Sequence, residues 1–197
     1  MGHAAEVRER GVTVVGGQDQ ARGHGVLSRQ QIAELIDTDP PLVAGLIDRE
    51  AQLQPNGIDL TLASVAAFTG PGTLGREDPR RRLPANEPLA FDRDDQVYLS
   101  PGPYLIRFNE IVNLPLDLMA HARPRSSLLR SGVALHTAVW DAGYSGRGAA
   151  LLVVYNPYGF RVQHDARIIQ LVFHRLDQPT GQAYRGIYHG EALPGDR

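Results

Sequence analysis

The sequence predicts an all-β domain with a short helical appendage on its N-terminal side. Beyond Gln54 the apolar residues form short runs that Gly, Pro, Asn or Asp separate at close intervals, and this spacing is typical of a β-sandwich or barrel. Before Gln54 a stretch with helical spacing takes the place of these runs, which indicates a helical segment. A length of 197 residues favours one domain with an appendage.

The N-terminal part begins with an arm and a first helix. Residues 1–26 are rich in glycine and lack sustained periodicity, so we expect them to form a mobile arm. In the stretch from Leu27 to Ile36, Ser28 can cap a helix and Gln31 stands three residues later, as in a capping box. The apolar residues of this stretch share one face, so we expect it to be helical.

A second short helix is expected from Pro40 to Arg49. Asp39 can act as its cap, and proline is favoured at the first helical positions. The two helices define a helical appendage over residues 27–50, ahead of the β domain.

The β domain is expected over residues 51–176 and is followed by a polar tail over residues 177–197. The segment Gly70–Asn86 is rich in proline and glycine, which indicates a surface excursion between strands. The unbroken run Leu151–Val154 predicts a strand buried on both faces, at a closed interior or a subunit interface. The apolar runs of the domain are Ile58–Val65, Val97–Leu99, Tyr104–Phe108, Leu118–Ala122, Ala149–Tyr155 and Ile168–Phe173.

The composition excludes several classes of protein. No run approaches the roughly 18 apolar residues of a membrane span, and the N-terminus lacks the layout of a secretory signal. The absence of Cys excludes disulfides and thiolate metal sites, and it suits a cytoplasmic protein. A net charge of −2 gives no electrostatic reason to expect nucleic-acid binding.

All 20 basic residues are Arg, and Lys is absent. Genomic base composition is the simplest explanation of this bias. Its consequence is that a P-loop lysine and a Schiff-base lysine are both excluded. Phosphate groups would have to be bound by Arg side chains, hydroxyls and backbone N–H groups.

Two familiar motifs are not supported by their context. The stretch Gly70–Gly75 matches G-x-G-x-x-G, but the helix that a dinucleotide site needs does not follow it, so we interpret it as a turn. The seven His residues show none of the close pairings of a zinc site. Without Cys the zinc-deaminase signature is absent as well, and we expect no metal held by the protein itself.

The segment Arg125-Ser126-Ser127, with Arg130 close behind, is a candidate phosphate site. Guanidinium groups and hydroxyls at the end of a strand can bind an oligophosphate through charge-assisted hydrogen bonds. The alternative is a helix start in which Ser126 and Ser127 are N-caps and Arg130 is solvated. The two interpretations are compatible, because a helix N-terminus also attracts anions.

Two further motifs follow the arginine–serine segment. The stretch Asp141–Gly146 contains Asp141 and Tyr144 between glycines, and by itself it would be an ordinary hairpin turn. The stretch Arg167–Leu171 has the apolar pattern of a strand with one amide, Gln170. Trp140, just before the hairpin, is expected to be a core residue.

In order and spacing these motifs resemble those of the dUTPase/dCTP deaminase superfamily, and most closely its archaeal-type dUTPase branch. The resemblance extends from about Gln54 to Glu191, and Gln54–Leu60 resembles the first motif of the family, where Asp59 is expected to be structural. It implies a distorted β-barrel or jelly-roll sandwich and hydrolysis of dUTP to dUMP and pyrophosphate. It also implies Mg²⁺ bound through the substrate triphosphate, and a homotrimer with active sites between subunits.

The resemblance also implies a role for each motif. Asp141 would be the general base and Gln170 would help to place the water, while Tyr144 would pack under the deoxyribose and exclude a 2′-hydroxyl. The tail over residues 177–197 would be a lid. The residues expected to bind substrate are Arg125, Ser126, Ser127, Arg130, His136, Thr137, Tyr144 and Tyr184.

The sequence departs from the deaminase branch at one important point. That branch requires a glutamate a few residues after the Asp-Gly turn, but no Glu lies between Glu110 and Glu191. General acid/base chemistry on the cytosine ring would therefore lack its agent. A deaminase, a bifunctional dCTP/dUTP enzyme and a catalytically silent nucleotide-binding module remain the alternatives to a dUTPase.

Overall fold

The computed structural model describes residues 25–193 of the chain, except for the side chain of Asp78. Of the arm expected over residues 1–26, residues 1–24 lie outside the described part. Gly25 and Val26 form the short strand β1, which pairs with the last strand of the chain. No helix in the described part is long and apolar enough to cross a membrane.

The first expected helix is confirmed and the second is wrong. Helix α1 spans Arg29–Ile36, and Ser28 and Gln31 form a reciprocal capping box. The segment from Pro40 to Arg49 contains no helix of its own; Val43–Ala44 forms the strand β2, and the four-residue helix α2 begins only at Arg49 with Asp48 as cap. A short helix is marginal without packing, whereas fully buried Val43 gains a strand partner, β8.

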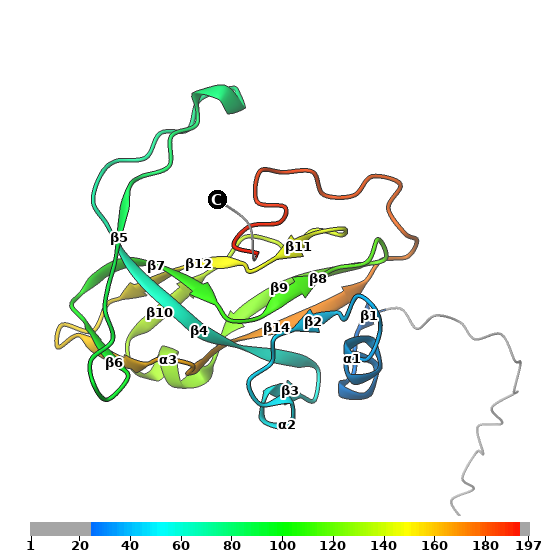
Figure 1. Cartoon of the computed structure of the whole chain (residues 1–197), viewed down its shortest axis with the longest axis horizontal. Helices are drawn as coiled ribbons and strands as arrows, with labels where there is room; N and C mark the ends of the chain where they lie inside the picture. The colour runs from blue at the N-terminus through cyan, green and yellow to red at the C-terminus, as the bar shows by residue number, and fades with distance from the viewer. Residues whose placement is uncertain (1–24, 194–197) are drawn as a thin grey trace, which may run out of the picture.

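The described chain is mostly strand, as the sequence predicts, and its main sheet has nine antiparallel strands that curl into a half-barrel (Figure 1). The path of this sheet runs β1-β14-β4-β7-β12-β10, with β3 and β5 paired to β4 and β9 paired to β14. A three-stranded sheet, β11-β8-β2, and a two-stranded sheet, β13-β6, complete the fold. The remaining elements are β3 (Leu53–Gln54), β4 (Gly57–Phe68), η1 (Asp78–Arg80), β5 (Asn86–Pro88), β6 (Gln96–Leu99), β7 (Gly102–Phe108), β8 (Ile111–Asn113), β9 (Leu118–Pro124), α3 (Ser126–Arg130), β10 (Val133–His136), β11 (Ser145–Gly146), β12 (Ala149–Val154), β13 (Phe160–Gln163) and β14 (Arg167–Arg175), while α2 ends at Gln52.

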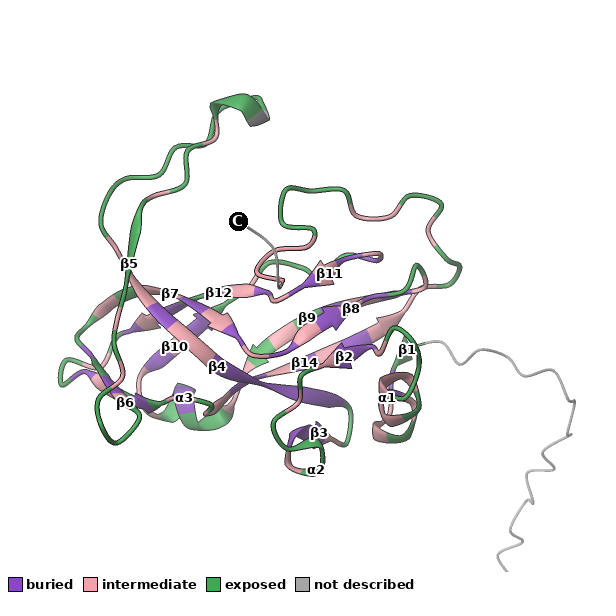
Figure 2. Ribbon diagram, in the orientation of Figure 1, coloured by how far each residue is buried: buried purple, intermediate pink, exposed green. Residues whose placement is uncertain are grey.

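The core lies between the curled strands, where apolar side chains such as Phe108 and Phe173 are fully buried. Figure 2 shows buried positions concentrated along the strands and exposed ones in the loops. The expectation that Leu151–Val154 is buried on both faces within a closed interior is wrong, and the alternative of a subunit interface stays a prediction. Leu152 and Val154 are buried, but Leu151 is 36% exposed, so β12 alternates between an inner and an outer face.

The segment Gly70–Asn86 is a surface excursion, as expected. It leaves the body between β4 and β5 as an extended arm with η1 at its tip (Figure 1). Backbone hydrogen bonds between Thr73 and Arg82 hold its two branches together, and Leu74 on this arm is 82% exposed.

A buried carboxylate stabilises the junction between the helical appendage and the sheet. Glu110 is fully buried, and its carboxylate accepts hydrogen bonds from the Gln52 amide and from both the hydroxyl and the backbone N–H of Thr61. Burial raises the pKa of Glu110, and the hydrogen bonds from Thr61 and Gln52 oppose only part of this increase.

Candidate functional site

The hairpin at Asp141–Gly146 borders a cavity of about 240 Å³. Asp141 is exposed at this cavity, whereas Tyr144 is only 6% exposed. The cavity is lined by Ala138, Val139, Trp140, Asp141, Tyr144, Gly148, Ala149, Tyr184, Tyr188 and Glu191. Three of the predicted site residues, Asp141, Tyr144 and Tyr184, therefore share one cavity.

The backbone of the hairpin is fixed by hydrogen bonds to the loop after β8. Gly143 donates to the carbonyl of Leu114, and Leu114 donates to the carbonyl of Tyr144, at 3.0 and 2.8 Å. Gly143 has a φ of +82°, a conformation that favours glycine. Trp140 is buried and its ring occupies the space where Gly148 lacks a side chain, so it is a core residue, as expected.

Tyr144 is held at its hydroxyl as well as at its backbone. The hydroxyl donates a hydrogen bond of 3.0 Å to Oε1 of Glu191, and Oε2 of Glu191 lies 3.5 Å from Nη1 of Arg107. Burial, followed by the nearby Glu191 carboxylate, raises the pKa of Tyr144. The phenol is therefore a proton donor in this contact, and the Tyr184 ring packs edge-on against it with the ring centroids 5.7 Å apart.

The C-terminal tail lies on the hairpin of its own chain. Tyr184 donates a backbone hydrogen bond of 2.9 Å to the carbonyl of Ala142. Further along, Gly190 donates to Ser145 and Arg147 donates to Glu191, at 2.7 and 3.1 Å. The tail and the hairpin thus line the same cavity from two sides.

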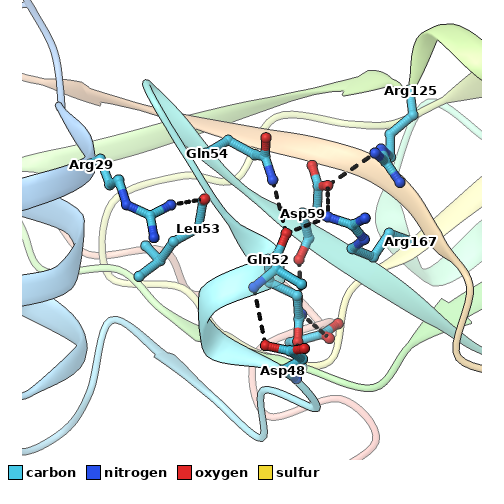
Figure 3. A network of polar contacts seen from close by, with 10 residues as sticks. Arg29, Asp48, Gln52, Leu53, Gln54, Asp59, Arg125 and Arg167 are labelled. Carbon is cyan, nitrogen blue, oxygen red and sulfur yellow. Dashed lines mark hydrogen bonds and ion pairs between the residues drawn. The ribbon is translucent and has the colours of Figure 1, made fainter.

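The candidate phosphate-binding arginine is anchored by a buried carboxylate. Arg125 lies just after β9 and Arg167 lies at the start of β14, and both point toward Asp59 on β4 (Figure 3). Oδ2 of Asp59 is 3.3 Å from Nε of Arg125 and 3.4 Å from Nη1 of Arg167. Asp59 is 1% exposed, and burial raises its pKa against the opposing effect of the two arginines.

Ser126 and Ser127 are exposed at the start of α3. The interpretation that they are N-caps is wrong, because Arg125 occupies the cap position and no side chain caps this helix. Arg130 is exposed and makes a long contact, 3.4 Å, with the carbonyl of Ser126. Ser126, Ser127 and Arg130 are exposed, so an anion can reach them, whereas Arg125 is half-buried beside Asp59.

Gln170 lies in the middle of β14, directly opposite Asp59 on β4 and Arg123 on β9. Residues opposite one another in antiparallel strands point to the same face of the sheet, so these three polar side chains form a row. Gly57 makes room for the amide, since a Cβ there would lie 2.8 Å from Nε2 of Gln170. The exposed Arg123 adds a further cation beside Arg125 and Arg167, and the sequence motifs did not indicate it.

His136 and Thr137 line a separate depression of about 210 Å³ beside β9. Ala138 and Val139 border both this depression and the cavity of Asp141, so the two are neighbours. Arg123 also lines the depression.

Apart from His136 and Thr137, which line the depression, the structure divides the predicted residues into two groups. Asp141, Tyr144 and Tyr184 line the cavity, while the arginine–serine segment and Gln170 lie on and beside the sheet formed by β4, β14 and β9. In Figure 1 the helix α3 and the strand β11, which mark the two groups, are well apart. The depression lined by Arg123 connects the two groups, because it shares Ala138 and Val139 with the cavity and Arg123 lies opposite Gln170.

No group of three or more His, Cys, Asp or Glu side chains within residues 25–193 is arranged to bind a metal ion. The chemistry available is a carboxylate beside an aromatic cavity, together with arginines and hydroxyls on an open sheet face. Such a set is suited to a nucleoside on one side and phosphate groups on the other.

Comparison with known proteins agrees with this description. Residues 26–176 match the family model described as dCTP deaminase-like. A protein of Methanosarcina mazei named probable deoxyuridine 5′-triphosphate nucleotidohydrolase is 45% identical over 84% of this chain and 97% of its own length. A protein of Archaeoglobus fulgidus with the same name is 48% identical over 85% of this chain and 98% of its own.

A solved structure with a related fold is the 2′-deoxycytidine 5′-triphosphate deaminase of Agrobacterium tumefaciens. Its TM-score is 0.57 at 24% identity, and the match covers 78% of this chain and 48% of that enzyme. At this identity the likeness establishes the fold alone.

Proposed function

The chain belongs to the dCTP deaminase-like family, and we propose that it hydrolyses dUTP to dUMP and pyrophosphate. The relatives named probable deoxyuridine 5′-triphosphate nucleotidohydrolase support this activity, because they match nearly the whole of the described chain and nearly the whole of their own length. The reaction would keep dUTP out of the deoxynucleotide pool and supply dUMP. The absence of Cys agrees with a cytoplasmic location.

The carboxylates around the cavity favour hydrolysis over deamination. β12, which follows the hairpin, carries only Ala, Leu and Val, so it offers no proton shuttle for attack on a cytosine ring. Glu191 does reach the cavity, but its carboxylate is engaged by Tyr144 and Arg107. Asp141 is left as the exposed carboxylate at the cavity, and this supports its proposed role in activating a water.

In the proposed reaction Asp141 takes a proton from the water that attacks the α-phosphorus, and the bond to the departing pyrophosphate breaks. Gln170 helps to place this water, and Tyr144 packs against the deoxyribose. Arg125, which Asp59 holds in place, binds the phosphates together with nearby groups. The nearby groups are Ser126, Ser127 and Arg130. Tyr184 closes the cavity, and His136 and Thr137 lie near the uracil ring.

Magnesium belongs to this proposal as a partner of the substrate. The described residues offer no cage of ligands, so Mg²⁺ would arrive on the triphosphate, whose charge it neutralises. Asp141 is an exposed carboxylate at the cavity and would be available to such a complex.

We further propose that the active site forms between subunits of a homotrimer. The position of α3, well away from β11 in Figure 1, supports this for Arg130, which would serve the site of a neighbouring subunit. The outer face of β12 and the rim of the cavity expose Leu151 and Val139, which are 36% and 46% exposed. In a trimer these side chains would be available for contact with a neighbouring subunit.

A side-by-side assay with dUTP and dCTP tests the proposed activity. With Mg²⁺ present, we expect release of dUMP and pyrophosphate from dUTP and no ammonia from dCTP. Release of ammonia at a rate comparable to dUTP cleavage would instead identify a deaminase. Binding of dUTP without turnover would identify the silent nucleotide-binding module.

A further inference from the structure

We propose that Glu191 is a positioning residue that fixes the ring of Tyr144 and thereby sets the selection of deoxyribose over ribose. This inference rests on the proposed function, in which Tyr144 packs against the sugar. Glu191 lies on the C-terminal tail, 47 positions from Tyr144 in the sequence, and no motif of the chain indicates it.

The contact is built from both sides of the carboxylate. Oε1 of Glu191 accepts the hydroxyl of Tyr144 at 3.0 Å, and Oε2 lies 3.5 Å from Nη1 of Arg107 on β7. The Glu191 side chain is 18% exposed, so the carboxylate is largely withdrawn from water. The arginine offsets its charge, which makes a carboxylate tolerable beside an aromatic cavity.

Backbone hydrogen bonds act together with the side-chain contact to place Glu191. Gly190 and Arg147 make the two hydrogen bonds that join this part of the tail to β11. Gly146 lies between them, and a Cβ at this position would be 2.8 Å from the Tyr144 hydroxyl oxygen and 3.3 Å from the Glu191 nitrogen. The absence of a side chain at Gly146 is thus what allows tail and tyrosine to meet.

A ring held at both ends is suited to discriminate by shape. The backbone of Tyr144 is fixed to Leu114, and its hydroxyl at the far end of the ring is fixed to Glu191. To exclude the 2′-hydroxyl of ribose, the ring must keep its position when a substrate binds. Rings keep their position when packing and hydrogen bonds fix their side-chain conformation. Without Glu191, the ring could tilt and admit a 2′-hydroxyl.

The test compares kcat/KM for dUTP and UTP in Glu191→Ala, Glu191→Gln, Tyr144→Phe and the double variant Tyr144→Phe/Glu191→Ala. We expect Glu191→Ala to lower the dUTP-to-UTP ratio about 10- to 100-fold, the worth of a hydrogen bond to a charged group. Glu191→Gln should keep most of the ratio, because an amide oxygen still accepts the phenol. The double variant should be no worse than either single variant, since both remove the same bond.

Ile187→Ala is the matched control in the same tail, because Ile187 is 63% exposed; it should keep the wild-type ratio. If Glu191→Ala also keeps the wild-type ratio, or if the losses of the two single variants add in the double variant, the inference is overturned.

A readout without nucleotide separates this inference from the proposed function. Arg185 is exposed in the tail, and trypsin cleaves after it when the tail opens. We expect faster cleavage in Glu191→Ala and wild-type cleavage in Glu191→Gln. A chain that does not hydrolyse dUTP at all would overturn the proposed function, while unchanged cleavage in Glu191→Ala would overturn the contact itself.

Discussion

Asp59→Asn tests how Asp59 holds Arg125, the arginine proposed to bind phosphate. Asp59 is 1% exposed, and its Oδ2 faces Arg125 and Arg167 at 3.3 and 3.4 Å. An asparagine fills the same space but cannot pair with two cations. The substitution therefore separates the packing role of this position from its charge.

The magnitude follows from the exposure of the partners. Breaking a fully buried ion pair costs about 3–5 kcal/mol. The side chains of Arg125 and Arg167 are 36% and 33% exposed, so water screens them. We therefore expect a loss of only about 1–2 kcal/mol in the free energy of unfolding. The effect on substrate binding should be larger than the effect on stability, because a displaced Arg125 no longer contacts the phosphates. We expect KM for dUTP to rise roughly 10- to 100-fold.

The assay combines steady-state kinetics on dUTP with thermal unfolding of the same samples. Asp117→Asn is the control, because Asp117 pairs with Arg175 through a carboxylate that is 19% exposed and does not contact Arg125. The control should lose stability without a change in KM. If Asp59→Asn behaves like the control, then Asp59 is structural only and Arg125 does not depend on it for phosphate binding.

The remaining predictions concern catalysis, assembly and pH. Asp141→Asn should keep the fold and lose about two to four orders of magnitude in kcat, the usual effect of removing a general base; near wild-type turnover would make Asp141 a turn residue. Mixing Asp141→Asn chains with Arg130→Ala chains should restore part of the activity, and a monomeric mass by light scattering would exclude the shared site. Glu110→Gln should lower the free energy of unfolding by about 1–3 kcal/mol, because an amide cannot accept all three hydrogen bonds. The folded-state pKa of Glu110 is raised above its usual 4.5, so its contribution to stability is present below pH 4.5 and is lost as pH rises through the raised value. The free energy of unfolding, measured with denaturant over this pH range, should change less with pH in Glu110→Gln than in the wild type. An identical pH dependence would contradict the raised pKa of Glu110.

The sequence predicts the fold best where the determinants are local. The capping box of Ser28 and Gln31 is confirmed because both partners lie within one turn of α1. The helix expected from Pro40 to Arg49 fails because pairing with β8, remote in the sequence, decides that segment. The burial of Leu151–Val154 is likewise decided by what covers the outer face of β12, which the apolar run does not reveal.

In the candidate site, too, the sequence identifies local motifs but not contacts between remote segments. Asp141 and Tyr144 are identified from the sequence because the hairpin is a contiguous motif, and the structure places both at one cavity. Asp59 belongs to the first motif of the family. Its ion pair with Arg125, however, depends on the pairing of β4, β14 and β9, which are far apart in the sequence. Glu191 carries no local signal, because its position results from the path of the tail across the hairpin.

Hydrolysis of dUTP in water enriched in ¹⁸O tests the central claim most directly. If a water activated by Asp141 attacks the α-phosphorus, mass spectrometry should find one ¹⁸O in dUMP and none in pyrophosphate. The label should disappear together with turnover in Asp141→Asn. Label in the pyrophosphate, or conversion of dCTP to dUTP with release of ammonia in the same preparation, would contradict the account.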